Sequence, residues 1–151
     1  MKFLSRLFSS RVRPGRAEHL ETGDWGEGEA AKLLKSKGCR ILGRNVRVGR
    51  RDEIDIVARD GKHLVFVEVK TRKNTDFGSP ASAVDRKKKY ALSRAAVRYI
   101  KSLRAPPVYV RFDVVEVVGT VRDGMESIRH LPNAFPLASP FRVPRQGYSG
   151  K

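Results

Sequence analysis

Three residues on two neighbouring segments of the chain are of the types that could act on a phosphate group: Asp55, Glu68 and Lys70. Carboxylate oxygens suit hard divalent cations, and an amine beside them could orient or deprotonate a water and neutralise charge on an attacked phosphate. The chemistry implied is metal-assisted hydrolysis of a phosphodiester bond. Magnesium fits best, with manganese as the alternative, because one cysteine and three histidines offer little to softer metals.

The two acids flank Asp60-Gly61, a dipeptide typical of a tight hairpin turn between alternating segments. A two-residue loop there predicts that Glu53 lies opposite Glu68. Asp55 is then the diagonal neighbour of Glu68, at roughly 7–8 Å between backbones. Lys70 projects from the same face as Glu68, because side chains alternate along a strand.

Opposed like charges destabilise paired strands, and the segment LVFVEVK around Glu68 is otherwise apolar. A cation between the carboxylates removes this difficulty. The alternative is a solvated strand face, the common origin of a Glu-x-Lys pattern. The opposite face of the hairpin is expected to be apolar, formed by Ile54, Ile56, Val65, Val67 and Val69.

The composition is strongly basic, with 32 Lys and Arg against 16 Asp and Glu and a formal net charge of +16. Such a field favours polyanions, nucleic acid above all. The alternatives are a surface that serves solubility, or a basic tail. The charge therefore predicts a nucleic-acid partner for the acidic site.

The single cysteine, Cys39, predicts no internal disulfide and no multi-cysteine zinc site, and indicates a reducing, cytoplasmic setting. No apolar run approaches the roughly 20 residues that span a bilayer, so no transmembrane segment is expected. Residues 1–17 lack acids and could form an amphipathic, membrane-surface or transit-like stretch; a disordered basic tail is the other interpretation.

Hydrophobic periodicity predicts a helix at residues 22–37, capped by Thr22 and weakened in its first turn by Gly26 and Gly28, and a second at residues 83–103. Strands are expected at residues 40–46, 53–58, 63–70, 109–118 and 120–128. The second helix should face the sheet through Val84, Ala91, Leu92, Ala95, Ala96, Tyr99 and Leu103.

The order helix, three strands, helix, strand predicts an α/β fold in which helices flank a mixed sheet. The length allows one domain with a modest core. We expect a basic, flexible segment at residues 1–21, the folded domain at 22–130 and a proline-rich, irregular tail at 131–151.

Four blocks carry a resemblance to a known family: GDWGEGEAAKLLKSKGCRILGRNVR, RRDEIDIVARDGKHLVFVEVKTR, FGSPASAVDRKKKYALSRAA and RFDVVEV. In this order, from Gly23 to Val117, they resemble the bacterial YraN family. That family resembles the restriction-endonuclease-like, PD-(D/E)XK nuclease fold and is close to archaeal Holliday junction resolvases. The resemblance implies a core of order αβββαβ, DNA rather than RNA as the partner, branched DNA included, and a homodimer.

The resemblance also implies roles for particular residues. Asp55 and Glu68 are implied as metal ligands, the main-chain carbonyl of Val69 as a third, and Lys70 as the catalytic lysine. Glu27 resembles the extra first-helix acid of the resolvase branch. The other interpretation of Glu27 is a solvated first-turn glutamate favoured by the helix dipole.

The chain departs from the family at Asp52, where the family usually has glycine. A third acid beside Glu53 and Asp55 could add a metal ligand or distort the start of the strand. The sequence leaves both interpretations open.

Basic residues flank the predicted site along the chain and are of the kind that contact phosphates: Arg44, Arg72, Lys73, Lys87, Lys88 and Lys89. Lys88 falls on the apolar stripe of its helix. We therefore expect it either to point inward, toward a phosphate or a carboxylate, or to snorkel from the helix start.

Two functions fit these observations. One is a magnesium-dependent nuclease acting on DNA, and the other is a non-catalytic nucleic-acid-binding module on the same fold. A third interpretation assigns the N-terminal stretch to a membrane-surface anchor.

Overall fold

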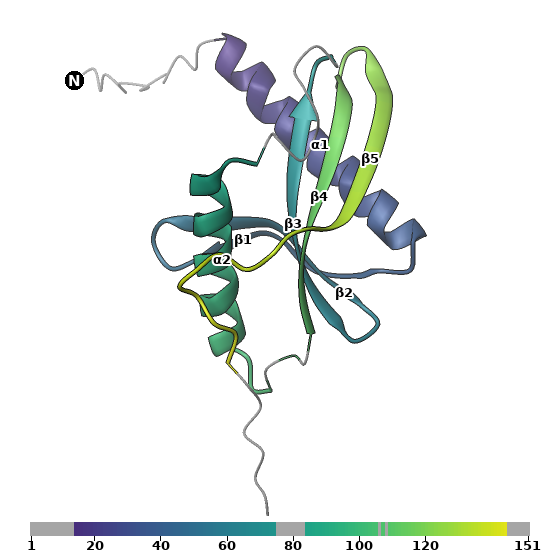
Figure 1. The fold of residues 1–151 in the computed structure, drawn as a ribbon. Coiled ribbons are helices and arrows are strands. Elements are labelled where there is room, and N and C mark those ends of the chain that lie inside the picture. The colour runs from purple at the N-terminus through teal and green to yellow at the C-terminus, as the bar shows by residue number, and fades with distance from the viewer. Residues whose placement is uncertain (1–13, 75–83, 106, 108, 145–151) are drawn as a thin grey trace, which may run out of the picture.

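The fold is seen in a computed structural model that describes residues 14–74, 84–105, 107 and 109–144 (Figure 1). The chain forms α1 (Pro14–Ser36), β1 (Arg40–Val48), β2 (Asp52–Asp60), β3 (His63–Arg72), α2 (Arg86–Lys101), β4 (Tyr109–Thr120) and β5 (Gly124–Phe135). The predicted α/β class, with helices on a mixed sheet, is confirmed. Most of the predicted basic segment and the end of the predicted tail lie outside the described residues.

The sheet has the strand order β1-β2-β3-β4-β5. β3 and β4 are parallel, whereas the other neighbours are antiparallel. Parallel neighbours need a long crossover connection, and α2 lies within it. β3 is the central strand, and its residues 64–68 are all buried. The apolar run around Glu68 is therefore a core strand.

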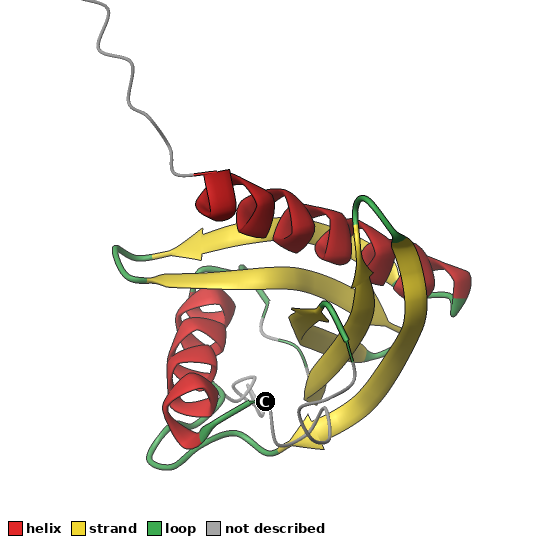
Figure 2. Ribbon diagram, turned by 90° about the horizontal axis from the view of Figure 1, so that it is seen from above, coloured by secondary structure: helices red, strands yellow, loops and turns green. Residues whose placement is uncertain are grey.

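The two helices cover opposite faces of the sheet (Figure 2). On one face Leu34 of α1 packs with Ile56, Val65 and Val67, and on the other Leu92 of α2 packs with apolar residues that include Phe66. Burying each large side chain stabilises the fold by roughly 1.5–3 kcal/mol. The sheet thus separates two apolar cores.

The face assignment of the hairpin is confirmed except at Ile54. Ile54 is fully buried in the α2-side core, whereas Ile56 lies in the α1-side core. Strict alternation would put both on one face. The pairing of β2 with β3 stops at Ile56, opposite Val67. Beyond this point β2 pairs with β1 alone, and its alternation relative to β3 is lost.

The predicted hairpin register is wrong by two residues. Asp60 pairs with His63, so the loop is Gly61-Lys62 and not Asp60-Gly61. Gly61 takes the turn position that requires a positive φ, at 55°. A shift of two residues keeps the side chains of the paired residues 56–60 on their predicted faces, because side chains alternate with a period of two. Asp55 lies one residue beyond the last pair, so the register alone does not decide where its side chain lies.

The first helix begins at Pro14, eight residues before the predicted cap at Thr22. Proline is favoured at the first helical position, where its missing N–H is not needed. Thr22 is instead a buried residue inside α1. Gly26 also lies well inside the helix, and a Cβ there would overlap the side chain of Thr71 on β3. The glycine is what lets α1 approach the sheet.

The last strand extends to Phe135, so residues 131–135 are not part of an irregular tail. Proline in the run obscured this, because proline normally interrupts a ladder. β5 is an edge strand, which tolerates Pro132, and its register shifts at Asn133, whose φ is 51°. Residues 136–144 lie outside helices and strands, but Ala138 N–H donates to Ser93 Oγ of α2 at 2.9 Å.

The second helix starts at Arg86, capped by Asp85, whose side chain accepts from Lys88 N–H. The predicted start at residue 83 lies outside the described residues. The predicted inward stripe is confirmed in the main: Leu92, Ala95 and Ala96 are buried, and Tyr99 packs against the core. Pattern reasoning missed Val97 and Ile100, which are also buried.

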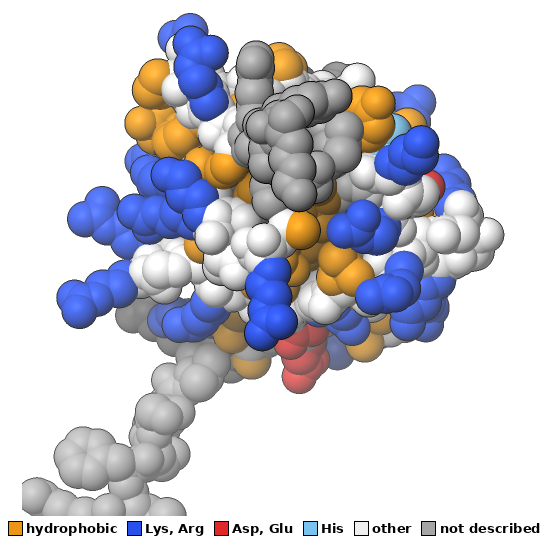
Figure 3. All heavy atoms as spheres, turned by 90° about the horizontal axis from the view of Figure 1, so that it is seen from below, with side chains coloured by type: hydrophobic (Ala, Val, Ile, Leu, Met, Phe, Trp, Pro, Cys, Tyr) orange, Lys and Arg blue, Asp and Glu red, His pale blue; other side chains and the backbone are white. Residues whose placement is uncertain are grey.

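The surface seen from below carries many Lys and Arg side chains and little visible acid (Figure 3). This agrees with the net charge of +16. Within the part of the chain that the structure describes, no helix is both long enough and apolar enough to cross a membrane.

Gly26→Ala is expected to destabilise the protein, although alanine is the better helix former by about 1 kcal/mol. The reason is the overlap with Thr71, which forces α1 away from β3. The matched control is Gly23→Ala, in the same helix, where a Cβ would meet nothing within 4 Å. Thermal unfolding should show a lower Tm for Gly26→Ala and an unchanged or higher Tm for Gly23→Ala. Equal Tm changes would contradict the packing role.

Candidate active site

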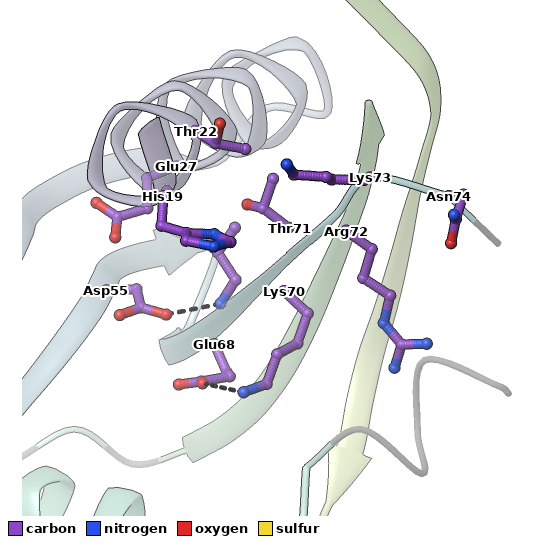
Figure 4. A pocket seen from close by; sticks show the side chains of 12 residues that line it. His19, Thr22, Glu27, Asp55, Glu68, Lys70, Thr71, Arg72, Lys73 and Asn74 are labelled. Atoms are coloured by element: carbon purple, nitrogen blue, oxygen red, sulfur yellow. Dashed lines mark hydrogen bonds and ion pairs between the residues drawn. The ribbon is translucent and has the colours of Figure 1, made fainter. Parts of the chain in front are cut away.

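A cavity of about 640 Å³ lies between α1 and the ends of β2 and β3 (Figure 4). In Figure 4 the carboxylates of Glu27, Asp55 and Glu68 lie on the same side of this cavity, although they come from α1, β2 and β3. Lys70 extends beside Glu68. The cavity is lined by His19, Thr22, Gly23, Glu27, Asp55, Glu68, Val69, Lys70, Thr71, Arg72, Lys73 and Asn74.

Asp55 occupies the point where β2 leaves β3. Its Oδ2 accepts a hydrogen bond from the main-chain N–H of Val69 at 2.8 Å. In a continued ladder that N–H would bond to the backbone of β2, so the Asp55 side chain substitutes for a lost strand partner. A strand residue directs its N–H and C=O to the same neighbour. The Val69 carbonyl therefore also faces the Asp55 side.

Glu68 is 2% exposed and is held by two lysines. Lys70 Nζ lies 3.2 Å from Oε1, and Lys88 Nζ lies 3.4 Å from Oε2. The second contact is an ion pair without hydrogen-bond geometry, and Glu68 Oε2 has no hydrogen-bond partner. A buried carboxylate oxygen in this condition is costly. It is suited to a ligand that supplies positive charge.

Glu27 reaches the cavity from α1 and is half-buried. Burial raises the pKa of Glu27, and the nearby charge of Asp24 adds to this, while a hydrogen bond from Asn45 and the charge of Arg44 lower it. Glu27 Oε2 is also buried without a hydrogen-bond partner. The interpretation as a solvated first-turn glutamate is therefore wrong, because Glu27 lies mid-helix and faces the site.

The carboxylates repel one another in this buried setting. Burial, followed by the negative charge of Glu68, raises the pKa of Asp55 to about 7, and Glu27 adds a smaller contribution. The Val69 hydrogen bond and the charge of Lys88 act in the opposite direction. Burial and the neighbouring carboxylates thus favour the protonated form of Asp55.

Comparison with known proteins shows the family to which the chain belongs. A model described as "Uncharacterised protein family UPF0102" matches residues 26–117, a range that contains Glu27, Asp55, Glu68 and Lys70. This chain belongs to the UPF0102 family. The resemblance to YraN that the sequence predicts is thereby confirmed.

Individual UPF0102 proteins match most of the chain. One from Syntrophomonas wolfei is 45% identical over 115 residues, which cover 76% of this chain and 97% of that protein. One from Symbiobacterium thermophilum is 47% identical over 113 residues, covering 75% of this chain and 94% of the relative. One from Chlorobaculum tepidum is 44% identical over 117 residues, covering 75% and 90%.

The basic residues predicted to contact phosphates lie in different surroundings in this UPF0102 protein. Lys88 points inward and pairs with Glu68, as one of its two interpretations predicted. Lys73 lines the cavity and pairs with Glu18 at 3.4 Å. Arg72 extends away from the carboxylates in Figure 4 and contacts Glu116 at 3.5 Å. Arg44 is exposed on β1, near Glu27.

Asp52 lies outside the cavity. Its carboxylate accepts two hydrogen bonds from Arg94 of α2, at 2.7 and 2.9 Å, and lies 4.0 Å from Arg98. The Arg94 hydrogen bonds lower the pKa of Asp52. The acid at the family's usual glycine position is therefore not a ligand beside Asp55: it ties the start of β2 to α2.

Sequence reasoning missed the α1 side of the cavity. His19, Thr22 and Gly23 line it together with Glu27. Their spacing of three, four and eight residues from His19 is that of one helix face, and this signal was available. It was hidden because the predicted helix began at Thr22, which left His19 outside the element.

The residues of the UPF0102 cavity fit a magnesium ion. Within the described ranges no three His, Cys, Asp or Glu side chains converge as metal ligands. Magnesium in proteins is often held by only one or two carboxylates, with waters and substrate phosphates completing its shell. Asp55, Glu68 and the Val69 carbonyl offer such a set, and Glu68 Oε2, which takes part in no hydrogen bond, retains acceptor capacity beside its ion pair with Lys88.

Asp55→Asn is expected to stabilise the protein in EDTA at about pH 8 by about 1 kcal/mol or more, with little effect near pH 4. The folded-state pKa of about 7 exceeds the ordinary 3.8. The folded state therefore binds more protons between these values, and wild-type stability falls as the pH rises through that window. Urea unfolding at both pH values measures the difference.

The control for this measurement is Glu126→Gln, which removes an exposed carboxylate on β5. Its effect should not change between the two pH values. A wild-type protein that is as stable as Asp55→Asn at about pH 8 would contradict the raised pKa.

Proposed function

We propose that this chain is a magnesium-dependent nuclease that hydrolyses phosphodiester bonds in DNA. One observation carries the proposal: carboxylates from two adjoining strands and Lys70 meet in one cavity of a strongly basic chain, and Lys88 contacts one of these carboxylates from α2. Carboxylates can hold the cation, and the basic field attracts the anionic substrate. The arrangement has no comparable structural purpose, because buried like charges weaken a sheet.

The proposal includes a restriction-endonuclease-like fold. Support comes from the order of α1, three strands, α2 and β4, and from the parallel pairing of β3 with β4. The acids lie on β2 and β3, as the resemblance implies. β5 is an addition at the sheet edge beyond that core. Fold alone does not decide activity, so we infer hydrolysis from the cavity and not from the fold.

Asp55, Glu68 and the Val69 carbonyl would hold the magnesium ion. When bound, such an ion polarises a phosphate oxygen and lowers the pKa of a water to make it a nucleophile. The protein's own contribution is to hold both carboxylates in place without rotation: Asp55 through Val69 N–H, and Glu68 through two amines. Glu27 is near enough to influence Asp55 electrostatically and could accept a proton from a water.

The two lysines have different surroundings. Lys70 lines the cavity and is about one-third exposed, whereas Lys88 approaches Glu68 from α2 on the other side. We assign to Lys70 the stabilisation of negative charge on the attacked phosphate. Lys88 holds Glu68 and is a positioning residue. Both amines start from an ion pair with a carboxylate, so neither must be brought to the site from solvent.

Glu68→Gln is expected to slow DNA cleavage by at least about 100-fold, because a metal ligand and several kcal/mol of transition-state charge stabilisation are lost. Purified protein is incubated with magnesium and a panel of linear, flapped and four-way DNAs, and products are resolved on gels. Glu126→Gln, the same chemical change at an exposed position, should cleave like wild type.

If wild type cleaves none of these DNAs faster than Glu68→Gln does, the nuclease proposal is ruled out. If that protein still binds DNA with a steep salt dependence, and Asp55→Ala binds equally well, the chain is a nucleic-acid-binding module. The same experiment therefore separates the two functions that the sequence left open.

Lys70→Met is expected to lower the cleavage rate by a similar factor without weakening Mn²⁺ binding, because the lysine is not a ligand and its positive charge repels the cation. Lys73→Met is the control, since Lys73 lines the same cavity but pairs with Glu18 on α1. Calorimetric titration with Mn²⁺ measures the affinity. A large loss of Mn²⁺ binding in Lys70→Met would contradict the assigned role.

A further inference from the structure

A second hollow, of about 490 Å³, is lined by Gly49 and by four arginines: Arg50, Arg51, Arg94 and Arg98. Two of the arginines come from the turn between β1 and β2, and two from α2. The proposed catalytic residues do not include any of them. In Figure 3 Lys and Arg side chains lie on both sides of the view, including the left, the side on which Figure 1 places this turn and α2.

The charge of this arginine pocket is poorly balanced. Asp52 is the acid paired with it among the described residues, through Arg94 and more distantly Arg98. Four guanidinium groups and one carboxylate leave an excess of three positive charges. Like charges held together repel unless an anion enters between them. Guanidinium groups bind phosphate through paired, parallel N–H donors.

One arginine of the pocket is held in place before a ligand arrives. Asp52 is buried and fixes the Arg94 guanidinium through two hydrogen bonds. Gly49 has a φ of 66°, and a Cβ there would lie 2.8 Å from Arg98 Nη1, at the tip of an exposed side chain. The absence of a side chain at Gly49 thus leaves the Arg98 guanidinium room beside the turn.

The arginine pocket lies near the catalytic cavity. Asp52 precedes Asp55 by three residues of β2, which corresponds to roughly 10 Å. Lys88 precedes Arg94 by six residues of α2, which corresponds to roughly 9 Å. Both offsets are short, so the arginines are close enough to the acids to contact a neighbouring part of the same bound nucleic acid.

We propose that the arginine pocket binds a backbone phosphate of the nucleic acid, close to but distinct from the phosphate in the catalytic cavity. That another phosphate of the same nucleic acid lies in the catalytic cavity rests on the proposed function. Phosphate binding at the arginine pocket itself does not require cleavage. A free phosphate ion has the same chemistry and is the alternative source of the ligand.

The test measures binding of the full chain to a fluorescent 20-base-pair duplex in EDTA, between about 50 and 200 mM KCl. Arg50→Gln/Arg51→Gln should lower affinity at least about tenfold at low salt and reduce the slope of log K against log salt by about 1 to 2. Arg98→Gln should reduce the slope by about 1 and leaves the Asp52–Arg94 pair in place.

The matched control is Arg59→Gln/Lys62→Gln, which removes the same charge from the hairpin turn at the other end of β2. It should change the slope by less than about 0.5. Equal losses in both double variants would overturn the proposal, because the charges would then act only as a general field. Circular-dichroism melts confirm that each variant is folded.

A titration with inorganic phosphate distinguishes the two ligands. A wild-type Tm that rises in millimolar phosphate, with no slope change in Arg50→Gln/Arg51→Gln, would assign the pocket to a free ion and overturn the backbone proposal. If wild type cleaves no DNA with magnesium but the slope falls as expected, the nuclease fails and the pocket stands. If cleavage is normal but the slope is unchanged, the nuclease stands and the pocket fails.

Discussion

The repulsion between Asp55 and Glu68 is the constraint around which this structure is arranged. Their strands are adjacent, and both side chains point into one partly enclosed cavity. The surrounding contacts all act to hold these charges: Val69 N–H on Asp55, and Lys70 and Lys88 on Glu68. The end of the β2–β3 ladder at Ile56 belongs to the same arrangement, because it releases the backbone donor that Asp55 accepts. Two acids held at one point, one of them with its pKa raised by burial and by its neighbour, are readily explained by a cation.

The α1 helix closes the cavity, and it can do so because of one small residue. Gly26 places the helix against Thr71, and the next residue, Glu27, then faces the acids on the sheet. A glycine inside a helix lowers its intrinsic stability. Close approach to β3 is the compensating gain. Gly26 therefore has a steric role and Glu27 an electrostatic one. Glu27 can face the acids only because Gly26 lets the helix approach the sheet.

The sequence predicted the site better than it predicted the elements around it. Alternation along two strands led to the prediction that Asp55, Glu68 and Lys70 converge, and all three line one cavity although the predicted register was wrong by two residues. Local patterns could not show that Ile54 changes sides, or that Pro132 is tolerated on an edge strand, because both depend on which strands are neighbours. The arginine pocket joins residues more than forty positions apart, beyond the reach of periodicity.

The α2 helix joins these features through its own backbone. Lys88 forms an ion pair with Glu68 near one end of the helix, and Arg94 forms one with Asp52 nearly two turns later. Main-chain hydrogen bonds fix the rise between the two, so neither contact can shift along the helix axis without the other. Asp52 and Asp55 are likewise fixed by the extended strand that carries both. β2 and α2 thus connect the acidic cavity to the arginines over similar lengths, and their backbone geometry sets the separation of the two sites.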